Sequence, residues 1–236
     1  MVYFYVPDLR PPLVTLPDDE AHHAVKVLRL RTHDEVALLD GRGYRYLARL
    51  VEVSPKRCRA EVLDRYFVHE RDYELHVALA PTKSLDRTEW FVEKAVEIGV
   101  DQITFVQTEH SERPRLRLDR LEKRAISALK QSQRARLPVL HGLTPLADFL
   151  RRPPNGAQRM IAHLAPEDTE FPGLDGAVSR EEDAYEVLIG PEGGFTPDEV
   201  EAAGAAGFRV VTLGAFRLRT ETAGIVACQT VALTGS

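Results

Sequence analysis

The chain has 236 residues, of which 44% are hydrophobic, and a formal net charge of −5 at pH 7. This composition is ordinary for a globular protein, no apolar run is long enough to cross a bilayer, and the N-terminus lacks the features of a signal peptide. We therefore expect a cytoplasmic protein of one large or two moderate domains, and the negative charge excludes a uniformly basic nucleic-acid binder.

Residues 1–70 form the first expected domain, a mostly β module of the size of a small barrel. Residues 2–6 are a strand candidate, and residues 17–28 are a helix candidate with an acidic first turn, which the helix dipole favours. Further strands are expected at residues 35–39, 44–53 and 57–67. Turn signals lie at residues 40–43 and 54–56.

From about residue 73 the pattern changes to alternating strands and helices. This rhythm predicts an α/β domain, residues 73–236, with a mainly parallel sheet and helices on both faces. The expected strands are residues 75–79, 102–106, 160–163, 185–189 and 208–213. The expected helices are residues 86–98, 119–133, 143–150, 197–204 and 222–233, and surface loops are expected at 151–156 and 166–183.

Two of these helices carry end signals. Asp86 and Glu89 form a D-x-x-E start, and Gly99 is expected to end the same helix. Thr196 and Glu199 fit a capping box, which predicts a helix that begins near Pro197. The C-terminal helix is apolar on more than one side, so we expect it to be buried.

Residues 112–136 carry a local excess of positive charge. The helix expected there would bury an apolar stripe and leave its basic side chains outside. We expect the basic side chains to contact RNA phosphates, on which nucleic-acid affinity mainly depends, while a solvated helix face is the alternative. The apolar residues are Leu121, Ala125, Ala128 and Leu129; the basic ones are Arg113, Arg115, Arg117, Arg120, Lys123, Arg124, Lys130, Arg134 and Arg136.

The cysteines and paired histidines do not indicate a metal site. Cys58 and Cys228 lie far apart without a CxxC motif, and we expect them to fill apolar space. His22 and His23 are adjacent on an expected helix, so their side chains point about 100° apart and cannot both face one ion. No metal is expected.

Two loops near the C-terminus follow apolar runs. The run at residues 185–189 is followed by GPEGG, residues 190–194. The run at residues 208–213 is followed by Gly214 and then by the polar segment RLRTET, residues 217–222. A helix separates the runs, so we expect a parallel pair of strands with both loops at one edge of the sheet. Ligands of α/β sheets bind at that edge, and glycine lets a ligand approach the backbone, although such loops often only turn. The G-x-G-x-x-G and GK[ST] motifs of other nucleotide-binding folds are absent.

The motifs IGPEGGF and LG-x-x-x-LRTETA resemble those of the ribosomal RNA small subunit methyltransferase E family, one of the SPOUT methyltransferases. The segment HHAVKVLRLRTHDEV resembles the family's HxxxVLRxxxGD signature, with His33 in place of a glycine. The segment from Lys83 resembles the family's K-x-x-R-x-E…K-x-x-E-x-G-V motif, with one additional residue between Lys83 and Arg87 and with Val96 in place of a threonine. The matching residues are Lys83, Arg87, Glu89, Lys94 and Glu97. Lys130 replaces a glutamate of the E-Q-x-x-R segment. The resemblance covers nearly the whole chain.

The resemblance implies a SPOUT-type domain with a C-terminal trefoil knot, an N-terminal PUA-like β-barrel that helps to hold RNA, and a homodimer formed through the SPOUT domain. It also implies S-adenosylmethionine-dependent methylation of N3 of a uridine in 16S ribosomal RNA, with free RNA or the small ribosomal subunit as partner. A non-catalytic RNA-binding protein is the alternative, but it leaves the two glycine-containing loops unexplained.

Residue roles follow from the same resemblance. Arg219 is expected to stabilise the uracil anion or to orient the nucleotide. Glu221 or Glu192 is expected to accept the N3 proton, which requires a raised carboxyl pKa, and each glutamate also has a structural alternative. The expected cofactor-binding residues are His163, Leu164, Ile189, Gly190, Pro191, Glu192, Gly193, Gly194, Leu213, Gly214, Leu218, Arg219, Thr222 and Ala223. The expected RNA-binding residues are Arg29, Arg31, Lys83, Arg87, Arg120, Lys123, Arg124 and Arg134.

Overall fold

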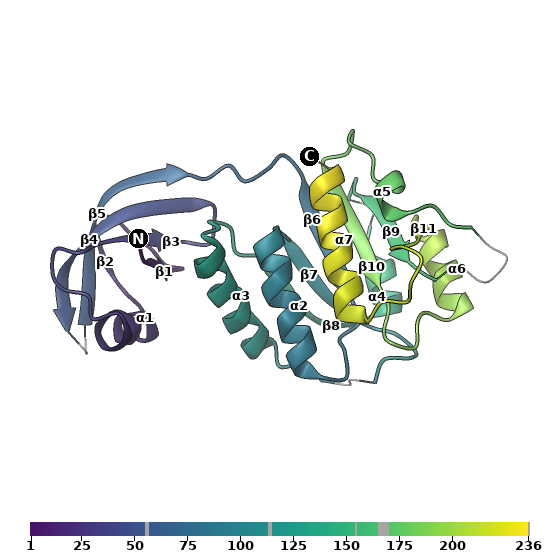
Figure 1. The fold of residues 1–236 in the computed structure, drawn as a ribbon, viewed down its shortest axis with the longest axis horizontal. Helices are drawn as coiled ribbons and strands as arrows, with labels where there is room; N and C mark the ends of the chain where they lie inside the picture. Colours follow the sequence, from purple (N-terminus) through teal and green to yellow (C-terminus); the bar gives the residue numbers. More distant parts are fainter. Residues whose placement is uncertain (55–56, 113–114, 154, 165–169, 236) are drawn as a thin grey trace. The chain divides into compact units, whose positions relative to one another are not determined.

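The computed structural model describes residues 1–54, 57–112, 115–153, 155–164 and 170–235 and divides into two compact units (Figure 1). The first comprises Met1–Glu70 and Ile126–Leu137, and the second comprises Arg71–Ala125 and Pro138–Ser236. Residues 126–137, which the sequence places in the second domain, therefore group with the first unit. Part of the turn expected at 54–56, Arg113, Pro154 and Pro166 lie outside the described residues.

The first unit contains a five-stranded sheet in the order β1-β3-β4-β5-β2. Its strands are β1 (Tyr3–Tyr5), β2 (Leu13–Thr15), β3 (Glu35–Leu39), β4 (Tyr44–Ser54) and β5 (Arg57–Phe67). The expected strands are confirmed, and the three-residue strand β2 was not foreseen because its only buried residue is Val14. Strand β1 pairs in parallel with β3, and the other pairs are antiparallel.

The expected N-terminal helix is confirmed, with a change of winding. It begins as α1 (Asp18–His22) and continues as the π-helical turn η1 (His23–Val27). Farther along, His33 has φ of 81°, in the left-handed region that favours glycine. The histidine therefore occupies a position where a glycine would fit without strain, which agrees with its place in the sequence signature.

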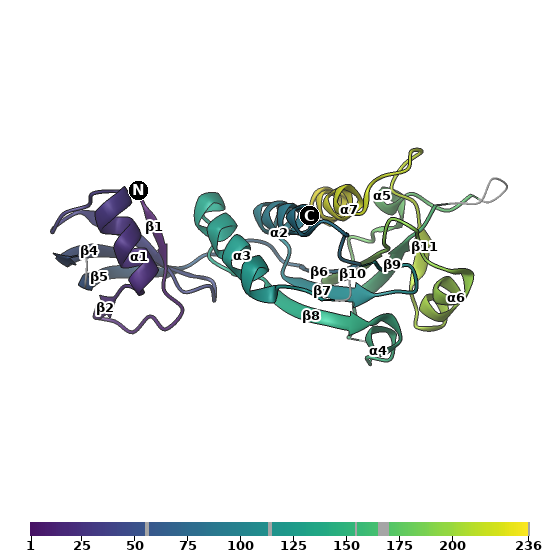
Figure 2. The ribbon, with the colours of Figure 1, turned by 90° about the horizontal axis from the view of Figure 1, so that it is seen from below.

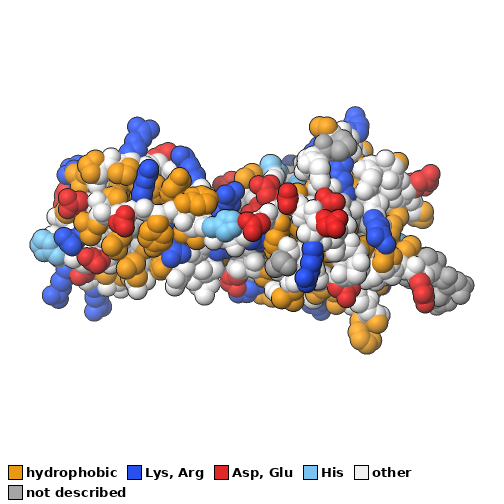
Figure 3. Space-filling view, turned by 90° about the horizontal axis from the view of Figure 1, so that it is seen from above, with side chains coloured by type: hydrophobic (Ala, Val, Ile, Leu, Met, Phe, Trp, Pro, Cys, Tyr) orange, Lys and Arg blue, Asp and Glu red, His pale blue; other side chains and the backbone are white. Residues whose placement is uncertain are grey.

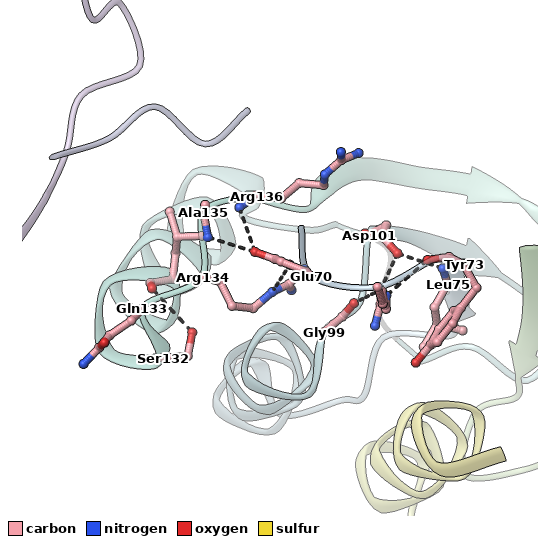
Figure 4. A network of polar contacts seen from close by, with 12 residues as sticks. Glu70, Tyr73, Leu75, Gly99, Asp101, Ser132, Gln133, Arg134, Ala135 and Arg136 are labelled. Carbon is pink, nitrogen blue, oxygen red and sulfur yellow. Dashed lines mark hydrogen bonds and ion pairs between the residues drawn. The ribbon is translucent and has the colours of Figure 1, made fainter. Parts of the chain in front are cut away.

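Residues 126–137 are joined to the rest of the first unit by backbone and side-chain bonds. The amide of Gly43 donates to Ala135 O at 3.0 Å, and Lys130 Nζ lies 2.7 Å from the buried carboxylate of Glu20. Glu70 pairs with Arg134 at 2.6 Å and also accepts hydrogen bonds from the amides of residues 135 and 136 (Figure 4). Burial raises the pKa of Glu70, but Arg134 and these amides outweigh it, and the net pKa lies below its ordinary value.

The second unit is built on a six-stranded sheet in the order β11-β9-β10-β6-β7-β8. Every pair of neighbouring strands is parallel. Its strands are β6 (Glu74–Leu79), β7 (Gln102–Gln107), β8 (Val139–Pro145), β9 (Gln158–Ala162), β10 (Ala184–Ile189) and β11 (Arg209–Val211). The expected α/β fold with a mainly parallel sheet is confirmed.

Helices cover both faces of this sheet, as expected. Figure 2 shows α2 (Leu85–Ile98), α7 (Thr220–Thr234) and α5 (Leu174–Ala177) on one face, and α4 (Leu146–Leu150) and α6 (Pro197–Ala205) on the other. The helix α3 (Leu118–Ser132) buries the predicted stripe of Leu121, Ala125, Ala128 and Leu129. No helix in the described part of the chain is both long enough and apolar enough to span a membrane.

Three expectations about the second unit are wrong in detail. Strands β10 and β11 are not neighbours, because β9 lies between them and pairs with both. The first residues of the helix expected at 143–150 belong to β8, and only Leu146–Leu150 is helical. Glu89 does not cap α2: the N-cap is Ser84, without a side-chain cap, and the Glu89 carboxylate is buried beside Arg120 and Arg124.

The other end signals are confirmed. The capping box of Thr196 and Glu199 is complete, and Gly99 ends α2 with φ of 124°. Cys58 and Cys228 are both buried, as expected of apolar fillers. Burial raises the pKa of the Cys228 thiol to about 12, so it stays protonated and unreactive at neutral pH.

A charged cluster is buried on the sheet of the second unit. Glu186 Oε1 lies 2.8 Å from His76 Nδ1 and 2.5 Å from an Arg152 nitrogen, and its Oε2 lies 3.1 Å from Arg159 Nε, outside hydrogen-bond geometry. His76 Nε2 lies 2.8 Å from Thr104 Oγ1. Burial raises the pKa of the Glu186 carboxyl, but His76 and Arg152 outweigh it, and the net pKa lies below its ordinary value. Glu186 is therefore ionised at neutral pH.

Candidate active site

A cavity lies at the edge of the parallel sheet where β9, β10 and β11 end. Its volume is about 300 Å³, which is at the lower end of the range for small-molecule sites. Its walls come from the end of β9, the loops that follow β10 and β11, and the first turn of α7. The two C-terminal loops singled out in the sequence therefore share one cavity.

The loop after β10 needs its glycines for packing and for backbone conformation. Gly194 has φ of +75°, and its amide donates to Pro191 O at 2.9 Å. A Cβ at Gly190 would lie 2.9 Å from the ring of Phe195, so only glycine lets this ring pack under the loop. The Phe195 ring is 6% exposed and forms part of the cavity lining. The glycines thus line the cavity themselves, and Gly190 also leaves room for the Phe195 ring that lines it.

The start of α7 is tied to the same loop. Thr220 Oγ1 donates to Gly190 O at 3.1 Å, which joins the first turn of α7 to the end of β10. Arg219 is the N-cap residue of α7, and its side chain is exposed. Glu221 is not among the residues that line the cavity: it is 7% exposed, and its Oε1 lies 3.7 Å from Arg87 Nε. The two residues expected to be catalytic therefore lie two positions apart in sequence, but Arg219 is exposed and Glu221 is buried.

Most of the residues expected to bind the cofactor line this cavity. Those that do are His163, Leu164, Ile189, Gly190, Pro191, Glu192, Gly193, Gly194, Leu213, Gly214, Leu218 and Ala223. Arg219 and Thr222 are not among the lining residues. The lining residues that the sequence did not single out are Ala162, Phe195, Phe216, Arg217 and Thr220. Ala162, Phe195, Arg217 and Thr220 are each next to a predicted residue, and Phe216 lies two positions from Gly214 and from Leu218.

Burial sets the charge of the histidine in this cavity. It lowers the pKa of His163 below its ordinary value, so the imidazole is neutral at neutral pH. Its backbone amide donates to Val211 O at 3.0 Å, which joins the end of β9 to β11. A neutral side chain at this position leaves the cavity free of a fixed positive charge on that wall.

The turn after β7 holds the loop after β10 in place, a contact that sequence reasoning missed. His110 Nδ1 lies 3.1 Å from Gly194 O, and its ring packs so closely on Gly193 that a Cβ there would lie 3.0 Å from His110 Cβ. The amide of Glu109 donates to Glu199 Oε1 at 2.8 Å, next to the capping box of α6. The turn therefore contacts the loop and the helix that follows it.

We expect the substitution His110→Ala to loosen the loop after β10. Losing one hydrogen bond of ordinary net strength corresponds to about 2- to 10-fold more frequent opening. Hydrogen exchange followed by mass spectrometry should show faster exchange of the amides at residues 192–195. The control is His22→Ala, an exposed histidine in α1 of the first unit. Unchanged exchange in the His110 variant would show that the contact does not hold the loop.

Several of the basic residues expected to bind RNA are already paired with carboxylates. Arg120 and Arg124 lie 2.7 Å and 3.3 Å from the buried Glu89, and the Arg134 side chain is only 10% exposed in its pair with Glu70. Nε and Nη2 of Arg134 both donate to Glu70 Oε2, so the RNA contact expected of this residue stays a prediction. The sequence could not reveal these pairs, because the partners are far apart along the chain.

The other expected RNA-binding residues are more accessible. Arg29, Arg31 and Lys123 are exposed. Lys83 is also exposed, although its Nζ lies 2.7 Å from Glu112, and the hydrogen bond and charge of Glu112 raise its pKa. On the face shown in Figure 3, Lys and Arg side chains project from the edge of the first unit. The accessible positive charge is therefore spread over several elements rather than concentrated on α3.

Comparison with known proteins identifies the class. Residues 69–232 match the family model of an RNA methyltransferase domain, and residues 16–63 match that of an RNA methyltransferase PUA domain. A crystal structure of a probable rRNA-methyltransferase from Porphyromonas gingivalis is 40% identical, with a TM-score of 0.91, covering 100% of this chain and 98% of that one. Fold, cavity and matches together define an RNA methyltransferase with an N-terminal PUA domain.

Two further relatives narrow the assignment. The ribosomal RNA small subunit methyltransferase E of Mycobacterium bovis is 34% identical over an alignment of 232 residues, and the match covers 90% of this chain and 87% of the relative. The structure of the protein of that name from Neisseria gonorrhoeae, bound to S-adenosyl methionine, is 30% identical with a TM-score of 0.88 and covers 99% and 97% of the two chains. This chain belongs to the ribosomal RNA small subunit methyltransferase E family.

Proposed function

We propose that this protein transfers the methyl group of S-adenosylmethionine to N3 of a uridine in 16S ribosomal RNA. The observation that carries the proposal is the cavity formed by the loops after β10 and β11, in a chain of this family. The substrate is free ribosomal RNA or the small ribosomal subunit, and such a substrate implies a cytoplasmic enzyme. The alternative, an RNA-binding protein without catalysis, gives no role to a preformed cavity of this kind.

The residues of the cavity fit the cofactor. Ile189, Phe195 and Leu213 offer apolar surface to the adenosine, and the backbone between Gly190 and Gly194 is open to close approach. The neutral His163 does not repel the positive sulfonium. When bound, S-adenosylmethionine supplies an electrophilic methyl group, and the chain must bring the uracil nitrogen into line with it.

The chain must also handle the N3 proton and the charge that its loss leaves on uracil. Arg219 is the proposed partner of that charge, since its exposed guanidinium stands at the start of α7 beside the cavity. Glu192 borders the cavity, whereas Glu221 is buried beside Arg87. We therefore favour Glu192 as the proton acceptor, directly or through water, and assign Glu221 to positioning Arg87.

We propose that RNA contacts are shared by the two units. The PUA domain supplies Arg29 and Arg31, and the second unit supplies Lys83, Arg87 and Lys123. Arg120 and Arg124 also contact RNA phosphates, with the parts of their guanidinium groups that Glu89 does not cover. We also propose a trefoil knot at the C-terminus, closure of the first sheet into a barrel, and a homodimer formed through the second unit. The exposed Leu233 of α7, 68% accessible, supports the last of these.

The test is a titration of the purified protein with S-adenosylmethionine by calorimetry, beside Arg219→Ala and Arg219→Lys. We expect all three to bind the cofactor with similar affinity. Methylation of 16S ribosomal RNA should fall about 100-fold in the Ala variant, the loss typical of removing one charge-stabilising group, and less in the Lys variant. Loss of cofactor binding in the Ala variant would instead make Arg219 a cofactor residue. No binding by the wild type would favour the RNA-binding alternative.

A further inference from the structure

The loop between β11 and α7 presents an aromatic ring to solvent beside the cavity. Phe216 lines the cavity and yet is 83% exposed, whereas the other phenylalanine of the lining, Phe195, is 6% exposed. The Phe216 ring therefore meets the cavity with a small part of its surface and turns the rest outward. A ring that served only as a wall for a small ligand would be more enclosed by the protein, as Phe195 is.

The same loop carries two exposed arginine side chains. Arg217 and Arg219 are exposed, and neither takes part in an ion pair with any residue that the structure describes. By contrast, Arg87, Arg120 and Arg124 in the same unit each lie beside a carboxylate. A loop that exposes an aromatic ring and two guanidinium groups complements one nucleotide, because the base offers a flat face and the phosphate offers negative charge.

We propose that Phe216 stacks on the target uracil and that Arg217 contacts a phosphate next to it. This inference rests on the proposed function and adds a specificity-determining residue to it. An enzyme that acts on a base must take the base out of its stack, and an aromatic side chain replaces part of the stacking that is lost. Phe216 stands at the rim of the cavity, so a base on its outer face lies at the entrance toward the cofactor.

The experiment compares Phe216→Leu and Phe216→Tyr with the wild type. Leucine keeps an apolar side chain but cannot stack, while tyrosine keeps the ring. We expect the KM for 16S ribosomal RNA to rise about tenfold in the Leu variant and to stay near the wild-type value in the Tyr variant. The affinity for S-adenosylmethionine, measured by calorimetry without RNA, should change less than twofold in both.

A second readout reports the stacking without turnover. An RNA fragment carrying 2-aminopurine at the position of the methylated uridine should gain fluorescence when the base leaves its stack, and it should gain less on the wild type and the Tyr variant than on the Leu variant, which has no ring to stack on. Phe67→Leu, a half-exposed phenylalanine in β5 of the first unit, is the matched control and should behave as the wild type.

The outcomes separate this inference from the function on which it rests. Equal KM and fluorescence in the wild type and the Leu variant would overturn the stacking role while leaving the methyltransferase intact. A loss of cofactor affinity in the Leu variant would also overturn it, because Phe216 would then belong to the cofactor site. A wild-type protein that binds no S-adenosylmethionine and methylates no RNA would refute the proposed function itself.

Discussion

Glu186→Gln is expected to lower the free energy of unfolding by about 3 kcal/mol at pH 7, which would be the largest effect of any conservative change in the second unit. The carboxylate is fully buried and faces His76, Arg152 and Arg159. A neutral amide keeps the volume but leaves buried positive charge without its counter-ion. Urea unfolding followed by circular dichroism measures the difference.

The pH dependence of the free energy of unfolding of the wild type and of Glu186→Gln tests whether the charge of Glu186 causes the difference. The pKa of Glu186 is below its ordinary value, so its contribution is present above the unfolded-state pKa of about 4.3 and is lost as the pH falls through the folded-state pKa. The wild type and the Gln variant should therefore converge in stability below about pH 4. A difference that stays constant with pH would mean that shape, rather than charge, determines the effect.

Glu74→Gln is the matched control for this experiment. Glu74 is an exposed glutamate at the start of β6, the strand beside β10. Because its carboxylate is in water, we expect its replacement to change stability by no more than about 0.5 kcal/mol. Equal stability of the Glu186 variant and the wild type at pH 7 would show that the two arginines find solvent or other partners when the carboxylate is gone.

Gly224→Ala is expected to destabilise the protein by about 1–3 kcal/mol and to weaken the cavity together with the fold. A Cβ at Gly224 in α7 would lie 2.5 Å from a ring carbon of Phe91 and 2.8 Å from Leu79 Cδ1. Helix α7 must move away from α2 and β6 to make room. Its first turn carries Thr220 and Ala223 into the cavity, so cofactor affinity should fall with stability.

Gly204→Ala is the opposite case on a helix of the other face of the sheet. Gly204 lies in α6, is exposed, and has no atom within 4 Å of the position of a new Cβ. Alanine favours helix over glycine by up to about 1 kcal/mol, so this variant should be more stable than the wild type. Thermal unfolding of the two variants should move in opposite directions. An increase in thermal stability of both variants would mean that helix propensity, and not packing, dominates at both positions.

The elements that could be predicted are those with a strong local signal. The alternation in β4 and β5 and the capping box at Thr196 gave boundaries within a residue or two of those observed. Strand β8 was missed because it lies at the edge of the sheet, contains Gly142 and Pro145, and has no fully buried residue. An exposed strand of this kind lacks the apolar pattern on which the prediction depends.

What depends on distant parts of the chain could not be predicted. The order of strands places β9 between β10 and β11, although β9 precedes both in sequence. Glu89 looked like a helix cap from its neighbours, but Arg124, 35 residues later, sets its role. Most of the expected cofactor-binding residues line one cavity, because they belong to a few contiguous motifs. The contact of His110 with Gly194 spans 84 residues and leaves no mark on either segment alone.

The membership of residues 126–137 in the first unit has a consequence for how this protein can be cut or recombined. A fragment that stops at residue 70 would leave the carboxylates of Glu20 and Glu70 without Lys130 and Arg134, and the amide of Gly43 without Ala135 O. Such a fragment should be expressed poorly or aggregate. A chimera that exchanges the N-terminal domain between relatives must also exchange the end of α3, because the first unit is discontinuous along the chain.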